Sequence, residues 1–268
     1  MNRLRLFNKI CKEIDSLKIQ GASNIAKKAF FAYKLIPKKS TIKKLLLIRP
    51  TEPMLKNIFK KYKNLSYKDL IKKLEKNQEI INRNVYSLIK NNYIIFTHCH
   101  SSTLTKALIY SKKNGKNFQV YNTETRPLFQ GRKTSKELKK AEIPVTMFID
   151  SAFLSAILKN KIDLILLGAD AITKEGIINK IGSGMYAEIS KLHKIPLYIV
   201  SDSLKFSKER IKIENRNPKE IWNEKSIKIY NPAFEFIPKK YISGIISEFG
   251  ILDFKKFIKK ANEMYDKV

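Results

Sequence analysis

Apolar residues change their spacing along the chain near residue 90. Before this point they recur every three or four positions, as in Ile10, Ile14 and Leu17, and again in Leu55–Tyr62, Leu70–Leu74 and Ile81–Leu88. This spacing is typical of amphipathic helices, because it places the apolar side chains on one face. We therefore expect residues 1–90 to form an N-terminal helical domain, in which Ser23 caps a helix that runs to about Tyr33.

From residue 91 onward, short apolar runs alternate with helical patterns. The runs have the length and the β-branched and aromatic content of buried strands; they are Tyr93–Phe96, Phe118–Asn122, Val145–Ile149, Leu164–Leu167 and Leu197–Val200. Helical patterns lie around residues 102–113, 133–141, 151–159 and 179–193. Such alternation is typical of βαβ units. We expect residues 91–268 to form a Rossmann-like α/β domain, with a mostly parallel sheet flanked by helices.

The last part of the chain has one more apolar segment, Phe234–Pro238. A helical pattern follows it over Lys239–Phe249. The stretch from 207 to 223 is polar and charged, and it favours an excursion over the surface rather than part of the core.

Composition narrows the classes of protein. No apolar run reaches the roughly 18 residues of a membrane helix, and the N-terminus lacks an apolar signal core, so we expect a cytoplasmic protein. The two cysteines, Cys11 and Cys99, are too few for a disulfide framework. The net charge of +30 comes from lysines spread over the whole chain. That spread argues against a nucleic-acid surface and suits the attraction of small anions such as sugar phosphates.

Two groups able to move protons follow predicted strands. Cys99 lies just past Tyr93–Phe96, and Asp170 lies just past Leu164–Leu167. In an open α/β sheet ligands bind at that edge, where a thiol and a carboxyl group can act as base and acid. A cysteine there is often a small core residue, and an aspartate is often a turn residue. However, a helix N-terminus after Cys99 would favour the thiolate, and burial of Asp170 would raise the pKa of its carboxyl group.

Metal and nucleotide cofactors are not expected. His98 and His100 flank Cys99, but in an extended chain they point away from the thiol, and the sequence has no second Cys/His cluster to complete a zinc site. The chain also lacks a G-x-G-x-x-G fingerprint and a Walker loop. We therefore expect chemistry without metal or cofactor.

Further polar groups lie at other strand ends. Asn179 and Lys180 precede a Gly-Ser-Gly helix entry that suits phosphate binding. Arg126 and Gln130 follow the predicted strand Phe118–Asn122, and Lys205 follows Leu197–Val200. Each of these segments taken alone is also typical of an ordinary surface loop, so the prediction of a binding site rests on their combination.

Six blocks of the chain, in order, resemble the initiation factor 2B alpha/beta/delta superfamily. They are THCHSST at 97–103, TETRPLFQGRKT at 123–134, IPVTMFIDSA at 143–152, GADAIT at 168–173, INKIGS at 178–183 and SLKF at 203–206. Two N-terminal segments, 18–23 and 48–51, extend the resemblance. The HCHS, TETRP and SLKF motifs are most similar to those of archaeal ribose-1,5-bisphosphate isomerases. The superfamily's isomerases keep the cysteine and the aspartate, which its translation subunits typically lack.

This resemblance implies a metal-free isomerase that converts ribose 1,5-bisphosphate to ribulose 1,5-bisphosphate in AMP or nucleoside salvage. It makes Cys99 the base that takes the proton from carbon 2 and Asp170 the acid. Substrate binding then maps to Gln20, Gly21, Ala22, Ser23, Arg49, Gln130, Asn179, Lys180 and Lys205. These isomerases usually carry Arg at position 20, so Gln20 removes one phosphate contact.

Two alternatives to this activity stay open. One is a non-catalytic regulatory subunit that resembles initiation factor 2B alpha, and the other is a methylthioribose-1-phosphate isomerase. The resemblance also implies a homo-oligomer, either a dimer or a hexamer. Some relatives are activated by nucleotides, so AMP is the activator to test.

Overall fold

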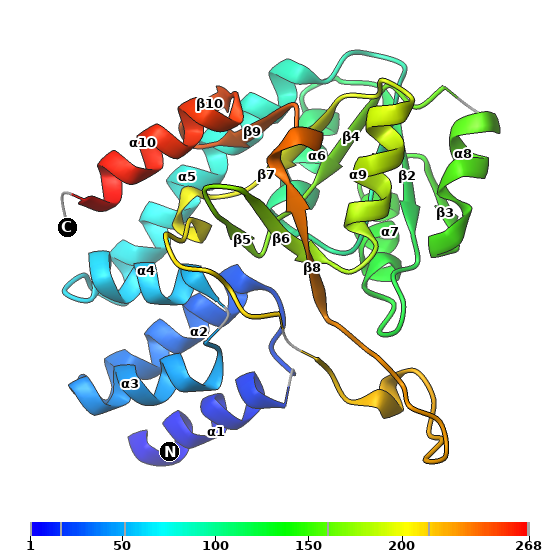
Figure 1. The fold of residues 1–268 in the computed structure, drawn as a ribbon. Coiled ribbons are helices and arrows are strands. Elements are labelled where there is room, and N and C mark those ends of the chain that lie inside the picture. Colours follow the sequence, from blue (N-terminus) through cyan, green and yellow to red (C-terminus); the bar gives the residue numbers. More distant parts are fainter. Residues whose placement is uncertain (1, 17, 51, 160, 214, 267–268) are drawn as a thin grey trace.

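Helices make up the first third of the protein. The structure is a computed structural model that describes residues 2–16, 18–50, 52–159, 161–213 and 215–266; Leu17 and Thr51, which belong to patterns named above, lie outside these ranges. The first helices are α1 (Arg3–Asp15), α2 (Ala22–Leu35), α3 (Lys39–Ile48), α4 (Pro53–Tyr62) and α5 (Tyr67–Leu88) (Figure 1). This confirms the helical character of residues 1–90, while the domain boundary itself stays a prediction.

The start of α2 differs from the prediction. Gly21, not Ser23, is the N-cap, and the helix begins at Ala22. Gly21 has φ +84, a left-handed conformation that costs glycine little and other residues more. Ser23 is already inside the helix, where its hydroxyl faces the sulfur of Met54 at 3.6 Å.

A seven-stranded sheet forms the centre of the molecule. Its order is β10-β9-β7-β4-β1-β2-β3, and all neighbours run parallel except β9 and β10. The strands are β1 (Tyr93–Thr97), β2 (Phe118–Thr123), β3 (Val145–Phe148), β4 (Leu164–Leu167), β7 (Leu197–Val200), β9 (Gly244–Ser247) and β10 (Gly250–Leu252). The six parallel strands have the Rossmann order, whose topological switch point lies between β1 and β4. The predicted Rossmann-like α/β class is therefore confirmed.

Helices cover both faces of this sheet, and β4 shows why. Leu164 and Leu166 pack into the cluster that contains α5, α6 and α7, whereas Ile165 and Leu167 pack into a second cluster on the opposite face. Alternate residues of a strand point to opposite faces, so a continuous apolar run has to be covered on both sides. The covering helices are α6 (Ser102–Lys113), α7 (Gln130–Lys140), α8 (Phe153–Lys159), α9 (Ser183–Leu192) and α10 (Phe254–Asp266).

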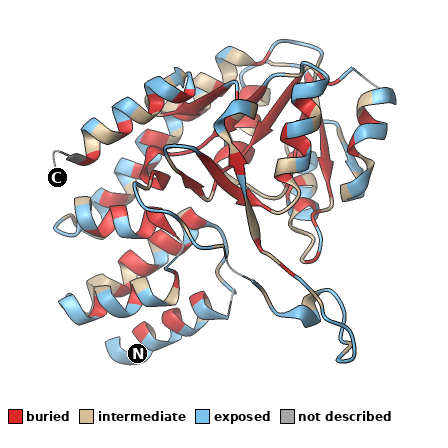
Figure 2. Cartoon of the chain, viewed as in Figure 1, coloured by how far each residue is buried: buried red, intermediate tan, exposed pale blue. Residues whose placement is uncertain are grey.

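The helical N-terminal part shares a core with the sheet. One buried apolar cluster extends from Phe7 in α1 and Phe30 in α2 to Leu167 in β4 and Phe257 in α10. Figure 2 shows this buried interior, with exposed residues on the outer faces of the helices. No helix in the described ranges has the length and apolar character that a bilayer crossing requires.

The structure moves the start of one predicted helix and contradicts another. The helix predicted over 179–193 begins only at Ser183, as α9, because residues up to Lys180 form strand β6 (Gly176–Lys180), which lies between β5 (Ala171–Ile172) and β8 (Phe234–Pro238) in a three-stranded sheet. The predicted helix over 239–249 is wrong: a short turn precedes β9. Apolar residues in β9 fall at spacings that fit either element, and over so short a run periodicity cannot decide between them.

Candidate active site

A single cavity of about 160 Å³ collects the predicted site residues. It opens beside the carboxyl ends of β1 and β4, at the switch point of the sheet. The cavity wall includes every site residue that the sequence predicted, namely Gln20, Gly21, Ala22, Ser23, Arg49, Cys99, Gln130, Asp170, Asn179, Lys180 and Lys205. Residues up to 185 positions apart in the chain therefore meet at one place.

Cys99 and Asp170 come from adjacent strands. Phe96 of β1 pairs with Ile165 of β4, so the loops that follow these strands lie side by side. Gly168 permits this approach, because a Cβ atom there would lie 2.8 Å from the Cβ atom of Ser101. That distance is shorter than real Cβ contacts allow, so any larger residue would push the two loops apart.

The backbone of Cys99 is held in an uncommon conformation. Its φ is +65, and its N–H donates to the hydroxyl of Thr125 at 3.0 Å. The carbonyl of Cys99 accepts from the hydroxyl of Thr134 at 2.8 Å. Two side chains from neighbouring segments thus fix a left-handed residue and its thiol, and strained residues of this kind cluster at functional sites.

Burial dominates the titration of Cys99 and Asp170. It raises the pKa of the Cys99 thiol to about 12, against the opposing charge of Lys180. The thiolate stabilisation expected from the following helix is therefore smaller than the cost of burial. Burial also raises the pKa of Asp170, although Lys205 and Lys180 oppose this shift. Burial therefore shifts both groups toward their protonated forms.

Buried cations line the same cavity. Lys180 and Lys205 are about 5% and 6% exposed, and the ammonium of Lys205 donates to the carbonyl of Ala169 at 2.5 Å. Burial lowers the pKa of Lys180, while the thiol of Cys99 is the largest influence in the opposite direction. Arg49 is also buried, and its guanidinium donates to the carbonyl of Ile14 at 3.3 Å. Buried ammonium and guanidinium groups around one cavity are suited to an anionic ligand.

Uncharged groups complete the wall. The N-terminus of α2 brings Gln20 to Ser23 to the cavity, where helix N–H groups can bind a phosphate. Asn179 donates to the hydroxyl of Ser183 at 2.9 Å, which fixes its amide next to Lys180. Among the described residues nothing donates to the buried Oε1 atom of Gln130, so this atom is placed to accept from a ligand hydroxyl. Arg126, by contrast, is exposed and lies over the ring of Phe129 rather than in the wall.

Hydrogen bonds to neighbouring hydroxyl and carbonyl groups hold the rings of His98 and His100. His98 is buried, and its ring nitrogens bond the hydroxyl of Thr123 at 2.6 Å and the carbonyl of Ile181 at 2.9 Å. Burial lowers the pKa of His98 to about 4, so its ring is neutral. His100 bonds the hydroxyl of Thr134 at 3.1 Å. Within the described ranges, no three His, Cys, Asp or Glu side chains gather as metal ligands.

Sequence reasoning missed Arg216. The polar stretch 207–223 is largely exposed, as expected, yet Arg216 turns back to the cavity wall. Its guanidinium makes a close ion pair with Glu220, with donor–acceptor distances between 2.6 and 3.1 Å. Asn231 fixes this arrangement by accepting from the Arg216 N–H at 2.8 Å. Nothing in the local pattern distinguishes this arginine from its exposed neighbours.

Curated relatives of the chain carry isomerase names. It is 32% identical to the ribose 1,5-bisphosphate isomerase of Methanocaldococcus jannaschii, over 94% of this chain and 93% of the relative. It is 31% identical to the enzyme of the same name from Thermococcus kodakarensis, over 91% and 89%. The identity to the Archaeoglobus fulgidus ribose 1,5-bisphosphate isomerase is 38%, over 61% of this chain and 55% of that relative.

Solved structures of other proteins share the fold of this chain. The Pyrococcus horikoshii translation initiation factor eIF-2B aligns with a TM-score of 0.82 at 23% identity, over 92% of this chain and 96% of that chain. The 5-methylthioribose 1-phosphate isomerase of the same organism aligns with a TM-score of 0.76 at 23% identity, over 96% and 88%. The sequence pattern of the initiation factor 2 subunit family matches residues 40–254. The chain therefore belongs to the initiation factor 2 subunit family.

Proposed function

We propose that the protein is an aldose–ketose isomerase that converts ribose 1,5-bisphosphate to ribulose 1,5-bisphosphate. The observation that carries this proposal is the placement of Cys99 and Asp170 in one cavity whose wall also holds the buried Lys180 and Lys205. A thiol and a carboxyl group supply the base and the acid of a proton shift, and the lysines receive phosphate. The names of the curated relatives support an isomerase of a sugar phosphate.

The reaction needs two proton transfers in each of two steps. In the first, Asp170 gives its proton to the ring oxygen, the bond from carbon 1 to that oxygen breaks, and the Cys99 thiolate takes the proton from carbon 2. The electrons of the C–H bond form a double bond between carbons 1 and 2. In the second, the Cys99 thiol returns its proton to carbon 1, while Asp170 takes the proton of the carbon 2 hydroxyl as the ketone forms. Both groups end in the state in which they began.

The raised pKa values in the cavity suit the proposed acid, Asp170, better than the proposed base, Cys99. The raised pKa of Asp170 keeps a proton available for the ring oxygen. Burial favours the neutral thiol of Cys99, so the thiolate that the first step uses has to form before the reaction, and the charge of Lys180 is the first influence that favours it. A bisphosphate brings about four negative charges, so Lys180, Lys205 and Arg49 are positioned to balance them.

A methylthioribose 1-phosphate isomerase is the second candidate. Relatives of that name are 38% identical to this chain over 62% of its length. That substrate has one phosphate fewer, so it requires fewer of the buried cations. The number of cations in the wall favours the bisphosphate.

The test compares both sugar phosphates as substrates of the purified protein, with and without AMP, and follows ketose formation by NMR. We expect turnover of ribose 1,5-bisphosphate, and its loss by at least about 1000-fold in Cys99→Ser and Asp170→Asn. Cys11→Ser, at the other cysteine and outside the cavity wall, is the matched control and should stay active. Turnover confined to the methylthioribose substrate would favour the second candidate, and no turnover of either would favour a regulatory subunit.

The assembly state also belongs to this proposal. We propose a homo-oligomer, a dimer or a hexamer, in AMP or nucleoside salvage within the cytoplasm. Sedimentation velocity on the purified protein gives its mass directly. A single species of 31.2 kDa, the mass of one chain, would contradict the proposed oligomer.

A further inference from the structure

Lys205 is presented to the cavity by a short turn, Ser203–Lys205, that follows β7. A lysine has a long flexible side chain, and within the described residues its head donates one hydrogen bond, to the carbonyl of Ala169. Where the ammonium lies therefore depends on how firmly the turn itself is fixed. The bonds that fix the turn come from segments that have no part in the cavity.

Helix α4 holds the two peptides around Lys205. The side-chain amide of Asn57 donates to the carbonyl of Leu204 at 2.7 Å and to the carbonyl of Phe206 at 2.8 Å. Asn57 is buried, so both bonds are shielded from water. One side chain thus fixes the residue before and the residue after the lysine.

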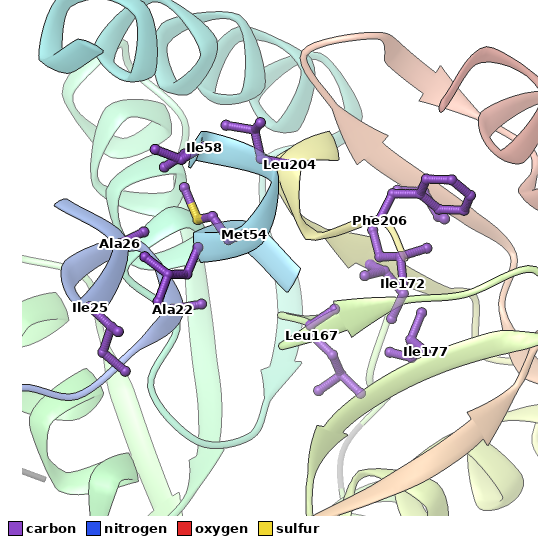
Figure 3. Close-up of a cluster of buried hydrophobic side chains, with 14 of the residues drawn as sticks. Ala22, Ile25, Ala26, Met54, Ile58, Leu167, Ile172, Ile177, Leu204 and Phe206 are labelled. Carbon is purple, nitrogen blue, oxygen red and sulfur yellow. The ribbon is translucent and has the colours of Figure 1, made fainter. Parts of the chain in front are cut away.

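Apolar contacts also fix the turn that carries Lys205. In Figure 3 the side chain of Leu204 lies beside Ile58 of α4, whereas Phe206 lies beside Ile172. All three residues of the chain from 204 to 206 are buried. Leu204 and Phe206 therefore anchor the backbone on two sides, and the side chain of Lys205 extends into the cavity.

Carboxyl groups hold the start of the turn. Asp202 accepts from the N–H of Leu204 at 2.8 Å and from the amide of Asn77 in α5 at 3.0 Å. Glu248, in the turn between β9 and β10, accepts from the N–H of Ser203 at 3.1 Å and also from its hydroxyl. Helices α4 and α5 and the turn between β9 and β10 therefore all contribute to the position of the Ser203–Lys205 turn.

Asn57, Asn77 and Glu248 are absent from the wall of the cavity. An effect of these residues on ligand binding has to pass through the turn that they hold. We propose that Asn57 is a positioning residue for Lys205, and that through it the helical N-terminal part sets the affinity of the cavity for a phosphate-bearing ligand. This rests on the proposed function only in that Lys205 takes an anionic ligand.

A double-mutant cycle tests this inference. The dissociation constant of inorganic pyrophosphate is measured by calorimetry for the unaltered protein, Asn57→Ala, Lys205→Ala and the double variant. Asn57→Ala should weaken binding roughly tenfold, because two buried bonds are lost. In the Lys205→Ala background the same change should alter binding by less than about twofold, because the group on which it acts is gone. Ser111→Ala, which removes a buried side-chain bond to a carbonyl of α6, is the matched control and should leave binding unchanged.

Two results would overturn the inference. One is an Asn57→Ala effect of the same size with and without Lys205, which indicates a general loss of structure. The other is an unaltered protein that fails to bind pyrophosphate. Asn57→Ser repeats the cycle with a smaller change if Asn57→Ala does not fold. Because pyrophosphate binding requires no turnover, an inactive protein that still shows the coupling would contradict the proposed isomerase and leave the role of Asn57 intact.

Discussion

The proposed mechanism uses Cys99 as a base in a place where burial favours its neutral form. The same burial suits Asp170, which the proposal uses as the acid. One cavity thus pushes both pKa values upward, and only the acid benefits directly. Lys180 is the group that separates the two roles, because its positive charge acts against the burial of the thiol.

Replacement of Lys180 tests this balance. Lys180→Met should lower kcat/KM by about 100-fold or more, because it removes both a phosphate contact and the charge that favours the thiolate. Activity should rise with pH as the thiol loses its proton, and in the variant this rise should move to higher pH. Full pH profiles of kcat/KM measure the shift. Lys174→Met, at an exposed lysine of the β5–β6 turn, is the control; an unmoved profile in Lys180→Met would mean that Lys180 does not act on Cys99.

Single residues of the site differed in how far sequence could predict them. Cys99 and Asp170 follow strands whose apolar runs are continuous, so their place at the sheet edge was predictable. The left-handed backbone of Cys99 was not, because it depends on Thr125 and Thr134 from other segments. The position of Arg216 was also not predictable, because its turn toward the cavity depends on Glu220 and on Asn231, which is fifteen residues away in the chain.

At the scale of elements, the loops after β1 and β4 must approach closely to form the site. Gly168 makes this possible, and the atoms it would otherwise meet belong to Ser101. The two loops can lie close together because residue 168 has no side chain. Strand order brings the loops to the same edge, and the absence of a side chain at Gly168 lets them approach as closely as they do.

A rescue experiment tests the role of Gly168. Gly168→Ala should lower kcat by at least about tenfold, because its new Cβ displaces the loop that carries Cys99. Ser101→Gly removes both atoms in the way and should restore activity in the double variant to the level of Ser101→Gly alone. Steady-state kinetics of the three variants provide the comparison. Failure of the rescue would show that the alanine acts other than by this contact.

Two carboxyl groups that hold the turn of Lys205, Asp202 and Glu248, interact with each other. Burial, and next to it the neighbouring Asp202, raise the pKa of Glu248 to about 7. The folded protein therefore keeps a proton on Glu248 that the unfolded chain loses near its ordinary pKa of 4.5. Since the unfolded state binds fewer protons in this range, stability falls as pH rises from about 4.5 to 7.

Glu248→Gln should remove this decline. The free energy of unfolding of the variant, relative to the unaltered protein, should increase by about 3 kcal/mol between pH 4.5 and pH 8. Urea unfolding at several pH values measures the difference. Glu263→Gln, at an exposed position of α10, should show no such trend. Parallel pH curves for Glu248→Gln and the unaltered protein would contradict the raised pKa.

Elements with long or isolated patterns were predictable, and short ones were not. The strands from β1 to β4 and the helix α6 agree with the predicted segments. Burial on two faces explains the clear signal of β4, whereas β3 is partly exposed. β9 was mistaken for a helix, since its few apolar residues fit both periods. β6 was assigned to a helix start because Gly182 and Ser183 resemble a helix entry, which in the structure begins only at Ser183.

At the scale of the whole molecule, the net charge of +30 has a kinetic consequence. A strongly positive protein attracts an anionic substrate over distances that salt shortens. We expect kcat/KM to fall roughly tenfold between 50 and 500 mM KCl, while kcat at saturating substrate changes little. Steady-state kinetics at several salt concentrations separate the two parameters. An equal fall in kcat would instead indicate an effect of salt on the catalytic step.

The cavity wall gathers residues from position 20 to position 234, so its parts leave the ribosome at very different times. A nascent chain that ends after β7 already contains Cys99 and Asp170 but still lacks Lys205 and Arg216. Two of the cations around the cavity are thus added near the end of synthesis, together with the strands β8 and β9 that complete the sheets. Until these residues have emerged the wall lacks two of its cations, so we expect anion binding only once nearly the whole chain is free to fold.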